Sequence, residues 1–147
     1  MKNMKNALLG LSLMTITAIS FVSCDDEKVV PSDEIPSTSQ TFLDRYFEGY
    51  SIDRVEKEGT TYSVSLQGGV EVDFNGNGEW IEVDGSDGVA IPTDFILDPI
   101  VMYVADEYPN EKINGIEKKV SGYDVDLLTQ DVDLLFDIEG KFTGIDR

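Results

Sequence analysis

The sequence contains no histidine, a single cysteine and few basic residues. The lack of histidine excludes Ser–His and Cys–His catalytic arrangements and the usual zinc sites. One cysteine excludes an intramolecular disulfide framework. The 11 Lys and Arg residues against 29 Asp and Glu residues give a formal net charge of −18, which disfavours binding to nucleic-acid phosphates. We therefore expect no nucleic-acid partner, and no motif indicates an enzyme, a catalytic residue or a cofactor.

Long apolar runs are also rare, and the longest one lies near the N-terminus. Lys2 and Lys5 precede a run of 16 apolar or small polar residues, Ala7 to Val22. This run is shorter than the roughly 20 residues that a membrane span needs, and it fits a signal-peptide core. It ends two residues before Cys24, which three acidic residues follow. The pattern resembles a bacterial lipoprotein signal, in which the cysteine is lipidated and becomes the first residue after cleavage.

The sequence thus predicts a lipoprotein signal peptide over residues 1–23, an acidic tether over 24–34 and a folded region over 35–147. An ordinary secretory signal with an incidental cysteine is the alternative. Acyl chains hold a protein at a bilayer, whereas an acidic surface is repelled by anionic headgroups. We expect membrane contact through the lipid alone, in the bacterial cell envelope, either in the periplasm or at the outer-membrane surface.

The region after residue 34 contains two copies of one pattern, and internal repeats of this kind indicate duplicated structural units. Ile35–Pro36 recurs as Ile91–Pro92. Apolar residues at alternating positions recur 61 or 62 positions later, and they are Tyr62, Val64, Leu66, Val70, Val72 and Phe74. The offset changes by one in an expected loop, where an insertion is tolerated. We define repeat one as residues 35–84 and repeat two as residues 91–146.

Each repeat begins with a helical pattern. In repeat one the apolar residues between 42 and 50 fall on one helical face, and Thr38 or Ser39 can cap the helix. In repeat two an apolar stripe runs from Phe95 to Tyr108. Pro99 lies inside this stripe and predicts a kink or a split, because proline lacks the N–H that a helix interior needs.

Four strands are expected after each helix. Large apolar residues alternate with small or acidic ones at 61–67, 70–74, 123–128 and 132–136, the period of a half-buried strand. The predicted fold class is α+β, with two tandem helix-plus-four-stranded antiparallel units that form one two-layer domain. A continuous sheet with both helices on one face buries more apolar surface than two separate sheets.

A helix followed by four strands, given twice behind a lipoprotein signal, resembles the PepSY-like, putative beta-lactamase-inhibitor-like family of secreted bacterial proteins and lipoproteins. The matching features are the two Ile-Pro pairs, Tyr108–Pro109, the strands around Tyr62 and Tyr123, and the stretches FNGNGEW and FDIEGKF. The resemblance covers about residues 35–147. It implies a two-layer α+β fold and a secreted binding or inhibitory role, and it brings no catalytic residues.

If the apolar strand residues face the helices, the residues between them form an exposed polar sheet face. This face would contain Ser63, Ser65, Glu71, Asp73, Asp124, Asp126, Leu128, Asp133 and Leu135, with Asp137 also expected there. Like charges on adjacent strands weaken a sheet, and exposed leucines among charges can mark a contact surface. We therefore predict a non-catalytic protein-binding face whose charge favours a basic partner. A solubilising face without a partner is the alternative.

The residues Asp73 to Gly78 match the first half of a calcium loop, D-x-N-x-N-G. Repeat two has Leu135 in place of Asp73 but keeps the turn, and Asn and Gly are also what a tight hairpin requires. The hairpin is the favoured interpretation. Asp73, Asn75 and Asn77 are the candidate cation ligands, and a small-ligand or calcium-binding envelope module is the alternative function.

Overall fold

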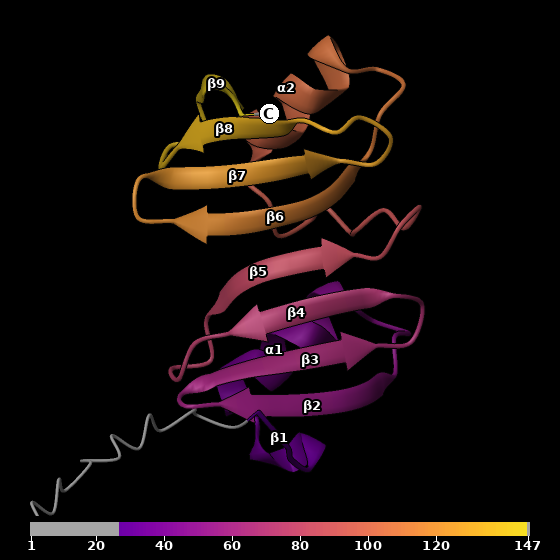
Figure 1. Ribbon diagram of the computed structural model, residues 1–147, viewed down its shortest axis with the longest axis vertical. Helices are drawn as coiled ribbons and strands as arrows, with labels where there is room; N and C mark the ends of the chain where they lie inside the picture. The colour runs from indigo at the N-terminus through magenta and orange to yellow at the C-terminus, as the bar shows by residue number, and fades with distance from the viewer. Residues whose placement is uncertain (1–26, 147) are drawn as a thin grey trace, which may run out of the picture.

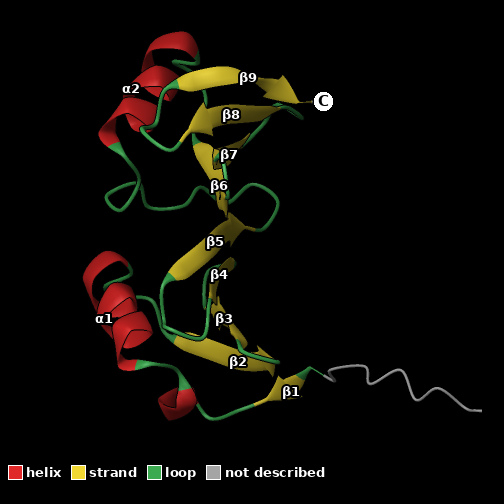
Figure 2. Ribbon diagram, turned by 90° about the vertical axis from the view of Figure 1, so that its left-hand side faces the viewer, coloured by secondary structure: helices red, strands yellow, loops and turns green. Residues whose placement is uncertain are grey.

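The computed structural model describes residues 27–146, which form a nine-stranded antiparallel sheet with two α-helices on one side (Figures 1 and 2). Each strand pairs with the next one along the chain. The elements are β1 (Lys28–Val29), η1 (Ser32–Glu34), α1 (Ser37–Tyr46), β2 (Ile52–Glu58), β3 (Thr61–Leu66), β4 (Val70–Phe74), β5 (Trp80–Gly85), α2 (Asp98–Glu107), β6 (Ile113–Lys119), β7 (Gly122–Leu127), β8 (Asp133–Asp137) and β9 (Phe142–Asp146).

The predicted α+β class with two tandem units is confirmed. Repeat one contributes α1 and strands β2 to β5, and repeat two contributes α2 and strands β6 to β9. The units meet where β5 pairs with β6, with Val83 opposite Ile116 at the centre of that ladder. The two halves therefore share one continuous sheet, and Figure 2 shows both helices on the same side of it.

The ninth strand, β1, comes from the segment that the sequence predicted to be a tether. Lys28 and Val29 pair with β2, and the backbone N–H of Val30 donates to the carbonyl of Val55 at 3.0 Å. Val30 is buried. The prediction was wrong for residues 28–34, because even two valines can pair and pack where a sheet offers an unpaired edge. Cys24 and the predicted signal peptide lie outside the described residues.

Two expectations about the helices were also wrong. Pro99 stands at the start of α2, where its missing N–H has no intrahelical partner to lose, so it marks the beginning of the helix instead of a kink. Ser39 lies within α1 and does not cap it. It is buried, and its hydroxyl donates to the carbonyl of Gly78 at 3.2 Å, which ties α1 to the turn before β5.

The core lies between the helices and the sheet. Alternate strand residues face it as the sequence predicted, and those with no exposed surface include Val64, Val72, Phe74, Val83, Val125 and Leu134. Because side chains alternate across a strand, burying these residues turns their polar neighbours to the opposite face. Neither α-helix of residues 27–146 covers that face (Figure 2).

Candidate functional site

The uncovered side of the sheet carries two rows of side chains in register across the strands. The first row, from β2 to β9, is Glu56, Ser63, Asp73, Glu82, Glu117, Asp124, Leu135 and Gly144. The second row is Arg54, Ser65, Glu71, Asp84, Gly115, Asp126, Asp133 and Asp146. We call the residues of these two rows the open face.

Most of the binding residues predicted from the sequence lie in these rows, but Leu128 and Asp137 do not. Leu128 follows the end of β7, and its backbone N–H donates to the carbonyl of Lys112 at 2.9 Å. Asp137 ends β8, and its Oδ1 accepts hydrogen bonds from the backbone N–H groups of Glu139 and Lys141 at 3.0 and 2.9 Å. Both residues therefore support loops at the ends of the strands.

Sequence reasoning missed the acids of the two central strands. Glu82 and Asp84 come from β5, and Glu117 comes from β6. The same alternation could have identified them. Val83, which lies between Glu82 and Asp84, is buried, and so is Ile116, which precedes Glu117. Their inclusion makes the acidic surface continuous across the junction between the repeats.

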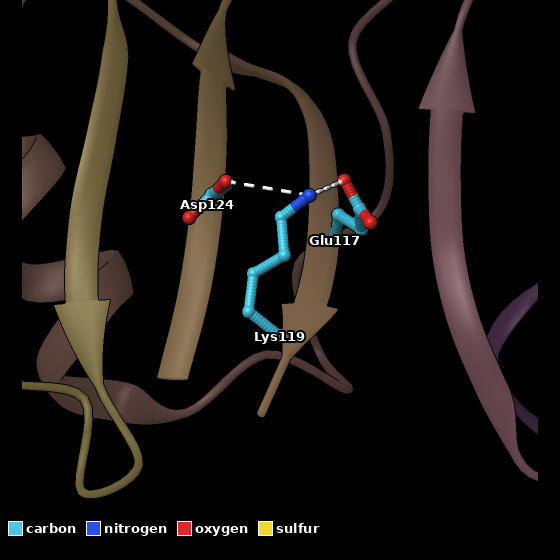
Figure 3. Close-up of polar contacts among 3 residues, drawn as sticks. All are labelled: Glu117, Lys119 and Asp124. Atoms are coloured by element: carbon cyan, nitrogen blue, oxygen red, sulfur yellow. Dashed lines mark hydrogen bonds and ion pairs between the residues drawn. The ribbon is translucent and has the colours of Figure 1, made fainter. Parts of the chain in front are cut away.

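Among residues 27–146, two basic side chains form ion pairs with acids of the open face. Arg54 forms an ion pair with Glu56 on β2. Lys119 extends from β6 between Glu117, with which it forms an ion pair, and Asp124 of β7, whose Oδ2 lies 3.5 Å from its Nζ (Figure 3).

Within the described residues, five carboxylates at the middle of the open face lack such partners. Within residues 27–146, no Lys or Arg side chain forms an ion pair with Glu71, Asp73, Glu82, Asp84 or Asp126. Acids outnumber bases here because β4 and β5 contribute only carboxylates to the two rows.

The surroundings of these carboxyl groups raise their pKa values. Burial raises the pKa of Asp73, Glu82 and Asp84, and neighbouring acids raise each of them further. Burial, together with a hydrogen bond to and repulsion from Asp133, raises the pKa of Asp126 to about 7. Desolvation and like charges both disfavour an ionised carboxyl, so the open face favours bound protons or cations over bare negative charge.

Two carboxylates converge above Gly115 in β6. A Cβ atom at this glycine would lie 2.9 Å from Oδ1 of Asp84 and 2.8 Å from Oδ2 of Asp126. Glycine therefore leaves the space that acids from the two flanking strands occupy. Within the described part of the chain, however, no three acidic, histidine or cysteine side chains are placed to hold a metal ion.

The candidate calcium loop is a hairpin turn. Asp73 belongs to β4 and lies on the open face, where a hydrogen bond with Ser63 lowers its pKa against the larger effect of burial. Oδ1 of Asn75 accepts hydrogen bonds from the backbone N–H groups of Asn77 and Glu79 at 3.0 and 3.1 Å. The side-chain oxygen of Asn75 therefore stabilises the turn, as the hairpin interpretation expects.

These observations define a two-layer α+β protein with one helix-covered sheet face and one extended acidic face. A family model described as "putative beta-lactamase-inhibitor-like, PepSY-like" matches the chain twice, over residues 21–72 and 60–144. The chain belongs to this PepSY-like family, as its sequence indicated. The two matches overlap at residues 60–72 and together span most of both repeats.

Solved structures of bacterial proteins have the same fold. A protein from Bacteroides thetaiotaomicron, described as a putative calcium-regulated periplasmic protein, has a TM-score of 0.76 and 28% identity, covering 84% of this chain and 98% of that one. A putative periplasmic protein from Bacteroides vulgatus has a TM-score of 0.74 and 30% identity, with the same coverage. A second one from Bacteroides vulgatus, of unknown function, has a TM-score of 0.76 and 25% identity, covering 83% of this chain and 100% of that one.

The search of curated proteins found no match. Neither α-helix in residues 27–146 has the length and apolar composition needed to cross a membrane.

Proposed function

We propose that the protein is a lipid-anchored, non-catalytic module of the bacterial periplasm or outer-membrane surface that binds a basic protein through its open face. The similar structures described as periplasmic support the location. The family description supports a binding or inhibitory role.

The observation that carries this proposal is the row of carboxylates at the middle of the open face. Their pKa values are raised, and Lys and Arg side chains of the described chain leave them without ion pairs. Lys or Arg side chains from a partner would relieve the repulsion between neighbouring strands. Such a contact adds favourable charge pairing, and it also reduces the repulsion between carboxylates that exists in the unbound protein.

The binding experiment compares two matched triple variants. In the first, Asp73, Asp84 and Asp126 of the open face become Asn. In the second, the exposed helix acids Asp44, Asp98 and Asp106 become Asn. Both variants replace three carboxyl groups by amides, so at a pH well above 7 they lose the same charge and only the position of the change differs.

We expect an envelope protein with a basic surface to be retained at low salt by the wild type and the helix variant, and lost from the open-face variant. Weakening at high salt is also expected, because exposed charges are screened. Equal retention by the two variants would assign binding to net charge alone and contradict a role for the open face.

The lipid anchor is tested separately at Cys24. Cys24→Ser removes the only thiol of the chain, so it should move the protein from the membrane fraction to the soluble fraction. Mass spectrometry of the mature wild-type protein should show an added diacylglycerol. Unchanged fractionation of the variant would rule out this anchor.

Calcium binding is a second candidate, favoured by the convergence of Asp84 and Asp126 above Gly115. One similar structure is also described as calcium-regulated. Calcium takes about 6–8 oxygen ligands, so water would complete a site built on these two carboxylates. Calcium should raise the melting temperature of the wild type but not of an Asp84→Asn, Asp126→Asn double variant. An equal effect of calcium on both proteins would reject this site.

A further inference from the structure

The two edges of the sheet are built differently. At the first edge, β1 has only two residues, one of which is Lys28, and Pro31 follows shortly after it. Short strands, lysine and proline are the devices by which sheets prevent further pairing. At the other edge, β9 has five residues, without lysine or proline. Figure 1 shows the two edge strands at opposite ends of the sheet.

The equivalent strand of repeat one, β5, has a neighbouring strand on each side, whereas β9 has one on one side only within the described residues. Val83 of β5 has no exposed surface, because β6 pairs alongside and places Ile116 next to it. Ile145 occupies the same position in β9 and is 43% exposed. Thus β9, an edge strand, has an apolar residue at a position that a neighbouring strand covers in β5.

The chemistry beside β9 indicates what could pair with it. An added strand would place alternate side chains on the two sides of the sheet. On the helix side they would contact Ile145, which favours an apolar residue. On the other side they would meet the end of the acidic open face, which favours Lys or Arg. A second copy of this chain would bring another net charge of −18 to the same place, so charge disfavours self-pairing.

We propose that β9 is a docking edge, at which an extended segment of alternating apolar and basic residues from a partner protein pairs as an additional strand. Backbone hydrogen bonds to β9 would supply affinity, and the alternating side chains would supply specificity. This site differs from the proposed open-face site, because it depends on backbone pairing at the edge of β9 and not on the carboxylates at the middle of the open face. Either proposal can fail without the other.

The probe is a short synthetic peptide of alternating valine and lysine, prepared also in two N-methylated forms. One form is methylated at the valine amides and the other at the lysine amides. Successive N–H groups of a strand point to opposite edges, so a strand paired on one side uses only one of the two sets. The peptide should bind the purified protein and protect backbone amides of β9 from hydrogen exchange, and one methylated form should fail to bind.

Ile145→Lys tests the edge itself, with Ile138→Lys as the matched control. Ile138 is 68% exposed and lies in the turn before β9, so the two variants have the same charge change on nearby exposed isoleucines. We expect Ile145→Lys to weaken peptide binding about tenfold relative to the control, because a charged edge residue opposes strand addition. Circular dichroism checks that both variants fold, and the methylated peptides test the wild type independently.

Equal binding of the two methylated peptides would show attraction by charge alone and overturn the proposal. Equal binding by the two lysine variants would also overturn it. If β9 amides are already protected by self-association without peptide, the occupant is a second copy and the proposal is wrong. The Asp73, Asp84, Asp126 triple variant separates the two proposals, since it should keep the difference between the methylated peptides even if it loses the open-face partner.

Discussion

The two repeats place different chemistry at the same pair of strand positions. In repeat one, the hydroxyl of Ser65 donates to Oε2 of Glu71 at 2.9 Å. In repeat two, Asp126 takes the place of Ser65 and lies opposite Asp133, and its pKa is raised to about 7. A hydroxyl satisfies its neighbouring carboxylate at any pH, whereas a second carboxyl does so only when protonated. One substitution on a shared backbone therefore changes a stable contact into a proton-dependent one.

The core and the turns differ much less between the repeats. Phe74 and Phe136 occupy equivalent positions and are both buried. The turns that follow use Asn75 and Asp137 in the same way, with Oδ1 accepting backbone N–H groups. The duplicated unit thus retains what the fold requires, and the repeats diverge mainly on the open face and at the sheet edges.

The largest expected effect tests whether the repeats unfold as one unit. Phe74→Ala and Phe136→Ala should each reduce the free energy of unfolding by about 3–5 kcal/mol, through lost burial and the cavity left behind. The single tryptophan, Trp80, belongs to repeat one and lies 6.5 Å from the Tyr123 ring of repeat two. Urea unfolding followed by its fluorescence should show one transition in each variant, at a lower urea concentration than in the wild type.

Phe136→Ala is the decisive member of this pair because its cavity lies in repeat two. If Trp80 fluorescence changes at the wild-type urea concentration in that variant, while circular dichroism shows an earlier loss of structure, the repeats unfold independently. The continuous β5–β6 ladder would then not couple them.

A smaller difference is expected at equivalent turn glycines. Gly78 and Gly140 both have positive φ, 81° and 80°, so alanine should cost about 1–2 kcal/mol at either position. A Cβ added at Gly78 would lie 2.8 Å from Cβ of Pro36. A Cβ added at Gly140 would lie 3.3 Å from Cγ1 of Ile100, which leaves more room. Overpacking should therefore make Gly78→Ala the more destabilising by about 1 kcal/mol in thermal or urea unfolding.

Gly88→Ala is the control for this comparison. Gly88 has φ of 81°, with open space around the position of its missing Cβ, so its substitution measures the backbone cost alone. If Gly78→Ala destabilises the protein no more than Gly88→Ala, the close approach of α1 to this turn has no energetic importance.

The Asp126–Asp133 pair should make the free energy of unfolding depend on pH more strongly than the Ser65–Glu71 pair does. We expect this difference to be about 1 kcal/mol, after allowance for solvent screening. The pKa of Asp126 is about 7 in the folded protein, against an ordinary value of 3.8. Between these values the folded state binds more protons than the unfolded state, so this pair makes stability fall as pH rises from about 4 to about 7. Asp126→Ser, which restores the chemistry of repeat one, should remove that fall and stabilise the protein above pH 7.

The reverse substitution completes the exchange. Ser65→Asp places a carboxyl opposite Glu71 and should add a second fall in stability over the same range. Urea unfolding at several pH values measures both changes. Parallel pH profiles for the wild type and Asp126→Ser would show that the Asp126–Asp133 contact carries no proton linkage.

Sequence periodicity predicted the repeats and the side of the sheet to which Val64 and Val125 point, because alternation depends only on local backbone geometry. It could not predict β1, since Val29 gains a strand partner only when the edge of β2 exists. The prediction of a kink or split at Pro99 was wrong, because a helix start and a kinked interior share the same local pattern. The meeting of Asp84 with Asp126 above Gly115 depends on the pairing of β5 with β6 and β6 with β7, which no local pattern specifies.

The smallest expected effect concerns two equivalent lysines that stack on different rings. Lys57 lies over Tyr62 of its own repeat at 4.9 Å, whereas Lys118 lies over Trp80 of the other repeat at 3.8 Å. Burial lowers the pKa of Lys118, so desolvation opposes the cation–π attraction. Lys118→Met keeps the length of the side chain without the charge, and it should change the free energy of unfolding by less than about 1 kcal/mol. Its Trp80 emission should nevertheless shift, while emission of the matched Lys57→Met variant should not. Unshifted emission in both variants would show that Lys118 does not join the repeats through Trp80.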